Sequence, residues 1–520
     1  MRVVLDPGDV IAVIDVGSNS VRLLLVRELS AVAFEVIDEE RFDARLGQGQ
    51  RNGMLTEAAM ERGLQAIRVA HEIAAAMEPA AIVVAGTEAL RRAPNAQEFI
   101  DGVREQTGLT VRVLSTAEEG YASFLGAINS TGMRDGYMVD IGGGSLEVMR
   151  VADGVLAEGQ SAPLGAIYST ERYLGGDPPT SKELRALRKA VREQIRVQPG
   201  PGTLIGIGGA VRNLARIERL KRKYPLRRLH GLVIPRVRLH SLAEQLAGAT
   251  HDQRRRMPGV STNRADILPA AAVVIDEVMA MTGAKSLMVA GQGLREGRVW
   301  QQIRGEGAVL PDVRAASVSG LQRANGVDEL AAEPVVAVAT RLFEATHAQH
   351  GLGAQWLDLL CVAARIAGIG MHVDYYNRDR HAEYLVHSGD LHGFSHREIV
   401  LLGATVRWAI SGTPDLTPYN AILEPDDLRA VGVLTATTNR APGEERQALP
   451  CRSWTARLEV TEGKEKHQPI LARAAALASQ ARRRYLDEMR QFRARRVSLD
   501  QDAGHDAVHR EVRHRQRARS

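Results

Sequence analysis

Two short segments, far apart in the chain, share one unusual pattern. Each has an apolar run ending in an aspartate, then one apolar residue, a turn rich in glycine and serine, and a second run of strand character. The first segment spans Val13–Ser20 and the second spans Val139–Ser145. An apolar run, a tight polar turn and another apolar run predict a strand, a turn and a strand. The repeat therefore predicts two similar halves that face each other across a cleft.

The residues of the two turns are suited to bind an anion and a metal ion. Glycine lets the backbone approach a ligand closely, and successive N–H groups of a tight turn form a concavity that binds anions. Ser18 and Ser145 add hydroxyl groups, and Asp15 and Asp140 stand where carboxylates can hold Mg²⁺. The alternative is a pair of ordinary tight turns whose aspartates only accept hydrogen bonds from turn N–H groups. Because the pattern occurs twice, we favour a paired phosphate-binding site.

The order of predicted elements indicates an α/β fold. Strands expected at 81–85, 111–114, 204–207 and 286–290 alternate with helical patterns at 57–77, 117–128 and 210–220. Beyond about residue 305 the patterns become mostly helical. We expect a first domain at 1–130, a second at 131–305, a helical domain at 306–425, a C-terminal subdomain at 426–490 and a basic tail at 491–520.

Composition excludes several classes of protein. The chain is 44% hydrophobic and 25% charged, which is ordinary for a globular protein. No uncharged apolar stretch is long enough for a membrane span, and the acidic N-terminus does not resemble a secretory signal. The only cysteines are Cys361 and Cys451, which fits a reducing compartment. We expect a cytoplasmic location and no membrane partner.

Positive charge concentrates near the C-terminus. The net charge is +5, and arginines cluster at 482–484, 493–496 and 513–519. This tail is either a solvated terminus or a segment that contacts a polyanion. Aromatic residues make up 4% of the chain and are not interleaved with these arginines, so platforms for base stacking are poorly supported. We expect no specific nucleic-acid partner.

Together the motifs resemble the Ppx/GppA family, the exopolyphosphatases and guanosine pentaphosphate phosphatases of the actin-like ATPase superfamily. The resemblance covers about residues 10–300 in order and, more faintly, 330–410. The matching motifs are Asp15–Ser20, Gly86–Arg91, Glu118–Gly120, Asp140–Ser145 with Glu147, Gly208-Gly209, Arg264–Asp266 and Gly293–Gly297. The resemblance implies two actin-like (ribonuclease H-like) domains, followed by a helical HD-like region, with phosphate hydrolysis in the cleft.

The resemblance also implies roles for particular residues. Glu119 is similar in position to the general base that deprotonates water, and Arg91 to a phosphate clamp. Asp140 is similar to the magnesium-linked carboxylate, and Glu147 to a second carboxylate near the metal or water. Asp15 is the second metal candidate, from its place at the end of the first strand. The implied phosphate cradle consists of Gly17, Ser18, Asn19, Gly142, Gly143, Gly144 and Ser145.

Three of these residues have plainer interpretations. Thr116 and Glu119 have the spacing of a capping box, in which the glutamate would only support a helix start. Arg91 follows a turn, where an arginine is usually solvated. Strand alternation gives Glu147 an even chance of facing the cleft.

The helical region resembles an HD domain that has lost its metal ligands. At the aligned position, Ala367 and Gly368 stand where a histidine and an acidic residue are expected. The His-Asp dipeptides of the chain, His251-Asp252 and His505-Asp506, lie elsewhere. We interpret the region as a degenerate domain that closes one end of the cleft and adds basic groups for a long anion.

The predicted function is that of an exopolyphosphatase. It would release orthophosphate from the end of inorganic polyphosphate by attack of water activated by Glu119, with Mg²⁺ or another divalent cation as cofactor. One alternative is a phosphohydrolase that removes the 5′ phosphate of guanosine pentaphosphate. An alternative of another class is a non-catalytic sensor that binds polyphosphate or an alarmone. The oligomeric state stays open, with a homodimer among the arrangements.

Overall fold

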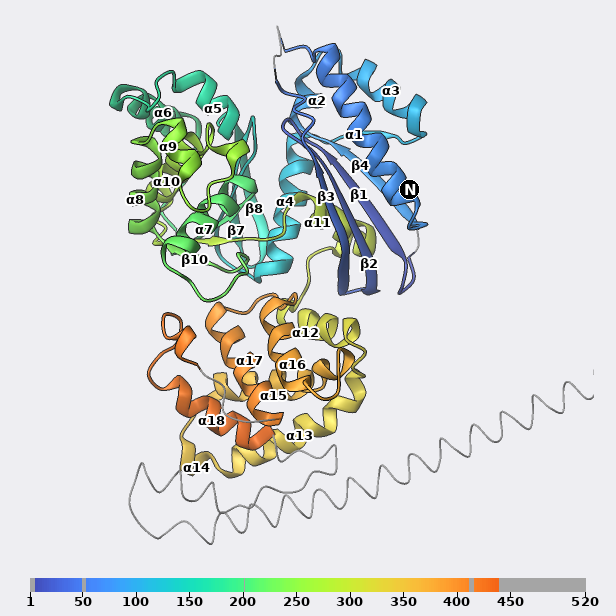
Figure 1. The fold of residues 1–520 in the computed structure, drawn as a ribbon, viewed down its shortest axis with the longest axis vertical. Helices are drawn as coiled ribbons and strands as arrows, with labels where there is room; N and C mark the ends of the chain where they lie inside the picture. The colour runs from blue at the N-terminus through green and yellow to red at the C-terminus, as the bar shows by residue number, and fades with distance from the viewer. Residues whose placement is uncertain (1–4, 49–52, 201, 411–415, 439–520) are drawn as a thin grey trace, which may run out of the picture.

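The computed structural model describes residues 5–48, 53–200, 202–410 and 416–438. Two α/β domains lie side by side, and a helical domain lies below both of them (Figure 1). The predictions for Cys451, His505, most of the 426–490 subdomain and the 491–520 tail fall outside the described residues.

The first domain is built on a five-stranded sheet with the order β3-β2-β1-β4-β5. The antiparallel strands β1 (Val10–Val16), β2 (Val21–Ser30) and β3 (Ala33–Phe42) are joined to the parallel strands β4 (Ala81–Gly86) and β5 (Val111–Val113). The strands β1 and β2 are almost continuously apolar, and their central residues are buried. The helices of this domain are α1 (Glu57–Ala75), α2 (Glu88–Arg92) and α3 (Ala96–Thr107).

The second domain is built on a six-stranded sheet with the order β10-β11-β9-β6-β7-β8. Its strands are β6 (Gly136–Ile141), β7 (Leu146–Ala152), β8 (Val155–Ala162), β9 (Thr203–Ile207), β10 (Val233–Pro235) and β11 (Ser286–Val289). The helices are α5 (Ala166–Tyr173), α6 (Ser181–Gln194), α7 (Gly209–Lys221), α8 (Arg236–Ala247), α9 (His251–Arg256) and α10 (Leu268–Thr282), with a short 3₁₀ turn, η1 (Thr262–Arg264).

The two predicted hairpins have matching geometry. In the first, Gly17 N donates to Ser20 O over 3.1 Å, and in the second, Gly142 N donates to Ser145 O over 3.0 Å. Each hairpin places an aspartate one residue before its last strand pair: Asp15 lies opposite Arg22, as Asp140 lies opposite Glu147. The sequence repeat therefore corresponds to a structural repeat, in which the two hairpins have the same strand register at the turn.

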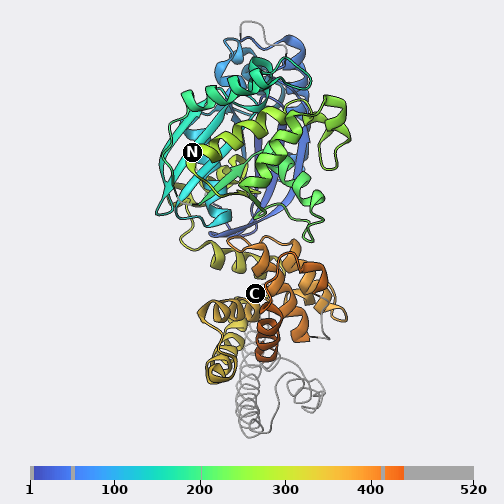
Figure 2. The same ribbon diagram turned by 90° about the vertical axis from the view of Figure 1, so that its left-hand side faces the viewer.

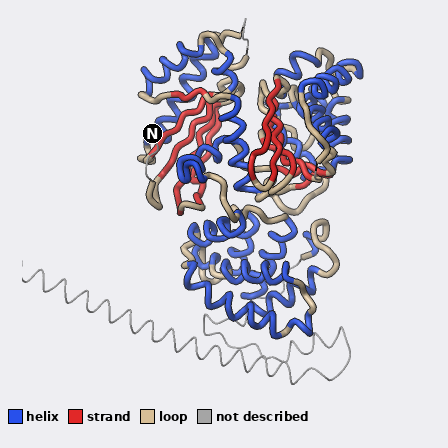
Figure 3. Tube along the Cα trace, turned by 180° about the vertical axis from the view of Figure 1, so that it is seen from behind, coloured by secondary structure: helices blue, strands red, loops and turns tan. Residues whose placement is uncertain are grey.

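Two helices lie between the sheets and join the domains (Figure 3). They are α4 (Thr116–Thr131) and α11 (Leu294–Arg304), and residues of both contribute to one core shared with strands of each sheet. The helices pack closely because glycines stand at their contact. A side chain at Gly126 would overlap the carbonyl of Gly293, and one at Gly297 would overlap the carbonyl of Ala122. This close contact between α4 and α11 holds the two α/β domains together.

The helical domain has its own core below the two sheets (Figure 2). Its helices are α12 (Val313–Ala324), α13 (Glu329–Ala345), α14 (His347–His350), α15 (Ala354–Ile366), α16 (Arg378–Ser388), α17 (His396–Ile410) and α18 (Asp427–Thr438). Because Ala430, Val431 and Leu434 of α18 lie in this core, the core extends past the boundary predicted at residue 425. Among the described residues one stretch, Ala354–His372, is long and apolar enough to cross a membrane, but half of its most apolar window is buried in the protein.

The architecture confirms the predicted fold class. Two mixed α/β domains are followed by a mostly helical one, and the predicted strand–turn–strand units are β1–β2 and β6–β7. The domain limits proposed from the sequence stay predictions, since α11 at the end of the second segment returns to pack on α4 of the first.

Candidate active site

A cavity of about 170 Å³ lies between the two turns. Its walls include Gly17–Ser20 from the first domain and Gly142, Gly143 and Ser145 from the second. The turns meet directly, because a Cβ built at Gly143 would lie 3.6 Å from Cβ of Ser18. The structure thus brings together the two turns that the sequence repeat singled out.

The second turn is held from behind by the start of α5. The carbonyl oxygens of Gly142, Gly143 and Gly144 accept hydrogen bonds of 2.8–3.1 Å from N–H groups at 165–168. Within the described residues, the N–H groups of Gly143 and Gly144 donate to no backbone carbonyl. A backbone whose acceptors are satisfied and whose donors are not is suited to an anion.

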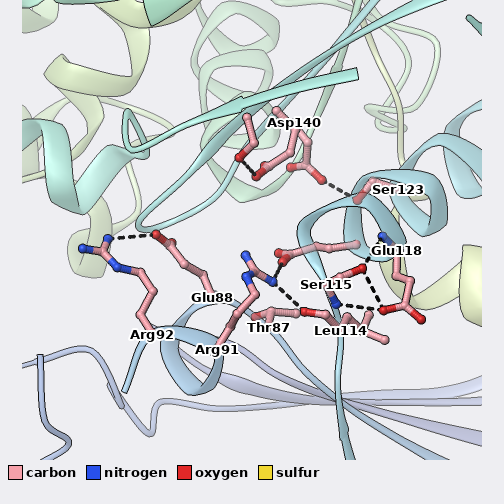
Figure 4. A network of polar contacts seen from close by, with 12 residues as sticks. Thr87, Glu88, Arg91, Arg92, Leu114, Ser115, Glu118, Ser123 and Asp140 are labelled. Carbon is pink, nitrogen blue, oxygen red and sulfur yellow. Dashed lines mark hydrogen bonds and ion pairs between the residues drawn. The ribbon is translucent and has the colours of Figure 1, made fainter. Parts of the chain in front are cut away.

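Asp15 and Asp140 come from corresponding strand ends and both line the cavity. Burial raises the pKa of each carboxyl group, and the charge of Asp140 raises the pKa of Asp15 further. Ser123 Oγ of α4 donates a hydrogen bond of 2.7 Å to Asp140, which favours its ionised form (Figure 4). The two carboxylates therefore interact electrostatically within one cavity.

Glu119 also lines the cavity, and the capping interpretation of this residue is wrong. The N-cap of α4 is Ser115, and Glu118 is the third residue that completes the capping box (Figure 4). Thr116 is the first residue of the helix and not its N-cap, so Glu119 is not part of the capping box. Arg91 Nη1 instead donates to Glu119 Oε2 over 2.7 Å.

The environment tunes the proton affinity of Glu119. Burial raises its pKa to about 7, Arg91 lowers the pKa in part, and the charges of Asp15 and Asp140 raise it. The carboxyl group has an exposed side-chain fraction of 15%. A carboxylate with a pKa near neutrality that borders a cavity has the protonation behaviour of a general base.

Arg91, Glu147 and Gly144 do not line the cavity. The Arg91 guanidinium is occupied by Glu119 and by the carbonyl oxygen of Leu114 at 2.8 Å. Glu147 is 5% exposed, accepts from Ser161 Oγ over 2.9 Å, and has its pKa raised to about 8 by burial and then by the charges of Asp140 and Glu119. The Glu88 carboxylate lies against Gly144, so a side chain at this position would displace that carboxylate. The roles proposed for these three residues stay predictions.

Four arginines that the sequence analysis did not select line the same cavity: Arg22, Arg212, Arg264 and Arg295. Burial, and then the charges of the neighbouring arginines, lowers the pKa of Arg22 and of Arg264 to about 10. Neither forms an ion pair with another described residue. Guanidinium groups that form no ion pair, at a cavity rich in turn N–H groups, favour a multiply charged anion.

Three of these arginines had a signal in the sequence, and one of them, Arg295, belongs to the Gly293–Gly297 motif. Arg22 lies opposite Asp15 across the hairpin, so the expected register places it beside the aspartate. Arg264 belongs to one of the motifs that carried the resemblance. Arg212, by contrast, lies on α7, and only the tertiary fold brings it to the cavity.

The donor set fits magnesium of the kind that shares its shell with substrate. Among the described residues, no group of three or more His, Cys, Asp and Glu side chains could hold a metal ion alone. Mg²⁺ in phosphate-transfer sites is held by one or two carboxylates, with water and phosphate oxygens completing the shell. Asp140 and Asp15 meet that requirement.

The fold and the cavity define a class: two α/β domains of actin-like architecture with a cavity between their matching turns, followed by a helical domain. A model of the Ppx/GppA phosphatase family matches residues 25–305, and a model of Ppx/GppA phosphatase domain III matches residues 313–425. The chain belongs to the Ppx/GppA phosphatase family. The family supports a phosphatase function, and the helical domain corresponds to the family's domain III.

Solved structures of similar proteins agree with this family assignment. A Ppx/GppA family member from Aquifex aeolicus is 28% identical, with a TM-score of 0.51, and the match covers 56% of this chain and 96% of the other. An exopolyphosphatase from Cytophaga hutchinsonii is 24% identical, with a TM-score of 0.54, and the match covers 58% of this chain and 100% of the other. The second likeness shows the fold alone. Both structures account for little more than half of the present chain.

Proposed function

We propose that this protein is an exopolyphosphatase, which hydrolyses the terminal phosphoanhydride bond of inorganic polyphosphate and releases orthophosphate. The observation that carries the proposal is the lining of the cavity. Two turns with N–H and hydroxyl donors and four arginines surround the space, and Glu119 borders it. These are the groups needed to hold a phosphate terminus and to activate water beside it.

In the proposed reaction, different groups around the cavity have different roles. The turns and arginines hold the terminal phosphoryl group, and Glu119 accepts a proton from the attacking water. The oxygen of water forms a bond to the terminal phosphorus while the bond from that phosphorus to the bridging oxygen breaks. The products are orthophosphate and a chain shorter by one phosphate. Mg²⁺ held by Asp140 and Asp15 would supply compensation for phosphate charge.

Arg91 has a positioning task in this proposal. Its guanidinium bridges Glu119 and the carbonyl of Leu114, so it holds the carboxylate at a fixed place and keeps part of its population ionised. This differs from the direct phosphate clamp implied by the family resemblance. Arg22 and Arg264 line the cavity and are the better candidates for contact with phosphate.

Polyphosphate is favoured over guanosine pentaphosphate by what the cavity contains. Its apolar wall consists of Ile141, Ile167, Ile207, Ile267 and Leu294, and within the described residues no aromatic side chain lines it. A guanine base is commonly bound by stacking on an aromatic ring or an arginine plane, and among the described residues this cavity offers only the arginines. A polyanion needs only successive cationic groups, which this cleft offers.

A substrate panel tests the proposal. Orthophosphate release is measured from polyphosphate and from guanosine pentaphosphate, with and without Mg²⁺, for the wild type and for Glu119→Ala. We expect Mg²⁺-dependent release from polyphosphate that the substitution abolishes. Preference for the guanosine nucleotide would replace our assignment with the second phosphatase activity. Tight binding without turnover, unchanged in Glu119→Ala, would indicate a sensor.

A further inference from the structure

Three histidines join the helical domain to the domains above it. His230 precedes β10 in the second domain, His392 lies in the loop before α17, and His396 is the first residue of α17. The rings of His230 and His392 meet edge to face, with centroids 5.1 Å apart. We call these three residues the histidine cluster. It does not line the cavity between the two turns.

The hydrogen bonds of His230 fix which of its nitrogens carries hydrogen. Gly291 N donates to Nδ1 over 3.0 Å, so Nδ1 must be the acceptor. Nε2 therefore carries the hydrogen and donates to the carbonyl oxygen of Ser130 over 3.0 Å. Ser130 is in the last turn of α4, the helix that carries Glu119 in its first turn. His230 thus connects the 291–293 loop with the far end of the Glu119 helix.

His392 extends these connections into the helical domain. Its Nδ1 lies 3.4 Å from Nε2 of His230, and its Nε2 lies 3.1 Å from the side-chain amide of Gln292. The Gln292 atom in this contact is the amide nitrogen, which can only donate, so Nε2 of His392 is the acceptor and the ring is neutral. The next residue, Gly393, donates from its N–H to Ser130 O over 3.1 Å.

His396 completes the cluster in the same protonation state. Its Nε2 donates to the carbonyl oxygen of His230 over 2.9 Å, which leaves Nδ1 to accept from the Tyr224 hydroxyl at 3.0 Å. The hydrogen bonds of His230 and His392 require neutral rings, and those of His396 are compatible with one. Burial lowers the pKa of each histidine, and Arg228, which donates to the carbonyls of Gly389 and Leu391, lowers it further. Asp390 is the nearby acidic group and acts in the opposite direction on His392.

The 291–293 loop that the cluster holds is also a wall of the cavity. Arg212 Nη1 donates to the carbonyl oxygen of Gly291 over 3.0 Å, and Arg212 lines the cavity. Gly293 lines it as well and donates its N–H to Glu296 Oε2 over 2.7 Å. The carbonyl of Gly291 therefore accepts a hydrogen bond from Arg212, and its N–H donates one to His230. A shift of Gly291 would move the Arg212 guanidinium, a cationic group of the cavity wall.

We propose that His392 is a positioning residue for the cleft: through His230 and Gln292 it holds the 291–293 loop, and with it Arg212, in the arrangement that binds the phosphate chain. The helical domain then contributes to substrate binding without contacting substrate. The expected kinetic effect rests on the proposed function. The expected structural effect on the loop does not, because it follows from the hydrogen bonds alone.

The test compares three variants of the full chain. His392→Phe keeps a buried ring and removes both polar contacts, whereas His392→Gln keeps an amide that can reach Gln292. His350→Phe is the matched control, because His350 is also buried in the helical domain but bonds only within it, to Phe343 O and to Leu352 N. We expect His392→Phe to raise KM for polyphosphate roughly tenfold with a smaller change in kcat, partial rescue in His392→Gln, and an unchanged KM in the control.

Hydrogen exchange supplies a readout that needs no substrate. We expect faster exchange at the Gly291 amide in His392→Phe than in the wild type and in His350→Phe. If His392→Phe does not fold, Gln292→Leu removes the same contact from the other side and should give the same two results. Unchanged KM and unchanged exchange, or equal effects in the control, would overturn the proposal. If the wild type does not hydrolyse polyphosphate, the proposed function fails, and the exchange result still decides the role of His392.

Discussion

Arg91 and Glu119 form an ion pair of 2.7 Å, in which the cation is 22% and the carboxylate 15% exposed. The pair joins α2 of the first domain to the first turn of α4, beside the cavity between the two turns. It therefore places a carboxylate of raised proton affinity where water can be activated.

Glu119→Gln should remove the general base while keeping the size of the side chain. We expect kcat to fall by about 10²–10⁴, the usual contribution of such a group, with KM nearly unchanged. Glu118→Gln is the matched control, because Glu118 caps α4 and does not line the cavity. Equal activity of wild type and Glu119→Gln in steady-state phosphate release would exclude the assigned role.

The pH dependence of activity should report Glu119. Its pKa is raised to about 7 chiefly by burial, and the base must be ionised, so kcat/KM is predicted to fall as pH decreases through about 7. Because Arg91 lowers the pKa, Arg91→Gln should move this acid limb to higher pH, by about one unit or more. Arg92→Gln, which alters an exposed arginine paired with Glu88, should leave it in place. A shift to lower pH in Arg91→Gln would contradict the electrostatic account.

Arg22→Ala and Arg264→Ala should weaken substrate binding. Each removes a charged donor from the cavity wall, and a charge-assisted hydrogen bond to phosphate is worth enough to change KM by roughly tenfold or more. Arg216→Ala is the control, because Arg216 is exposed on α7 and bonds Ser261. KM for tripolyphosphate, measured at two salt concentrations, distinguishes the cavity arginines from general surface charge.

Magnesium should stabilise the folded protein through Asp140. Thermal unfolding of the substrate-free protein is predicted to shift upward with Mg²⁺, because a ligand that binds only the native state stabilises it. Asp140→Asn should lose most of this shift, whereas Asp153→Asn, an exposed turn residue, should keep it. A shift that persists in full in Asp140→Asn would place the cation elsewhere.

Glu147 should make stability depend on pH. Burial raises its pKa to about 8 from an ordinary value of 4.5. A group with a raised native pKa gives its full stabilisation below the unfolded pKa and loses it as pH rises through the folded value. We therefore predict a falling Tm between about pH 5 and pH 8 without metal, and a smaller fall in Glu147→Gln. An identical fall in wild type and variant would contradict the pKa shift.

The repeat made the centre of the site predictable. Asp15 and Asp140 each stand near the end of a strand before a tight turn, and an apolar run followed by a Gly/Ser turn specifies that geometry locally. The pairing of the two turns follows from their similarity, and it required no knowledge of the connections. The fold class followed from the alternation of strands and helices.

The rest of the site depends on tertiary structure. Arg212 and Arg22 belong to different domains, and nothing local in the sequence relates them. The start of α4 differs by one residue from the expected capping box, because Ser115 and Thr116 are both good N-caps and only the backbone decides between them. Arg91 was expected to contact phosphate. Its ion pair with Glu119 was not predicted, because this contact depends on how α2 packs beside α4.

The central claim is that the two turns hold one terminal phosphate between them. The most direct measurement is a crystal structure of Glu119→Gln with Mg²⁺ and tripolyphosphate. We predict the terminal phosphate between Gly17–Ser20 and Gly142–Ser145, with Arg22 and Arg264 within hydrogen-bond distance of its oxygens. Tripolyphosphate bound outside this cavity, for example in the larger groove lined by Tyr137, Arg150 and Arg196, would contradict the account.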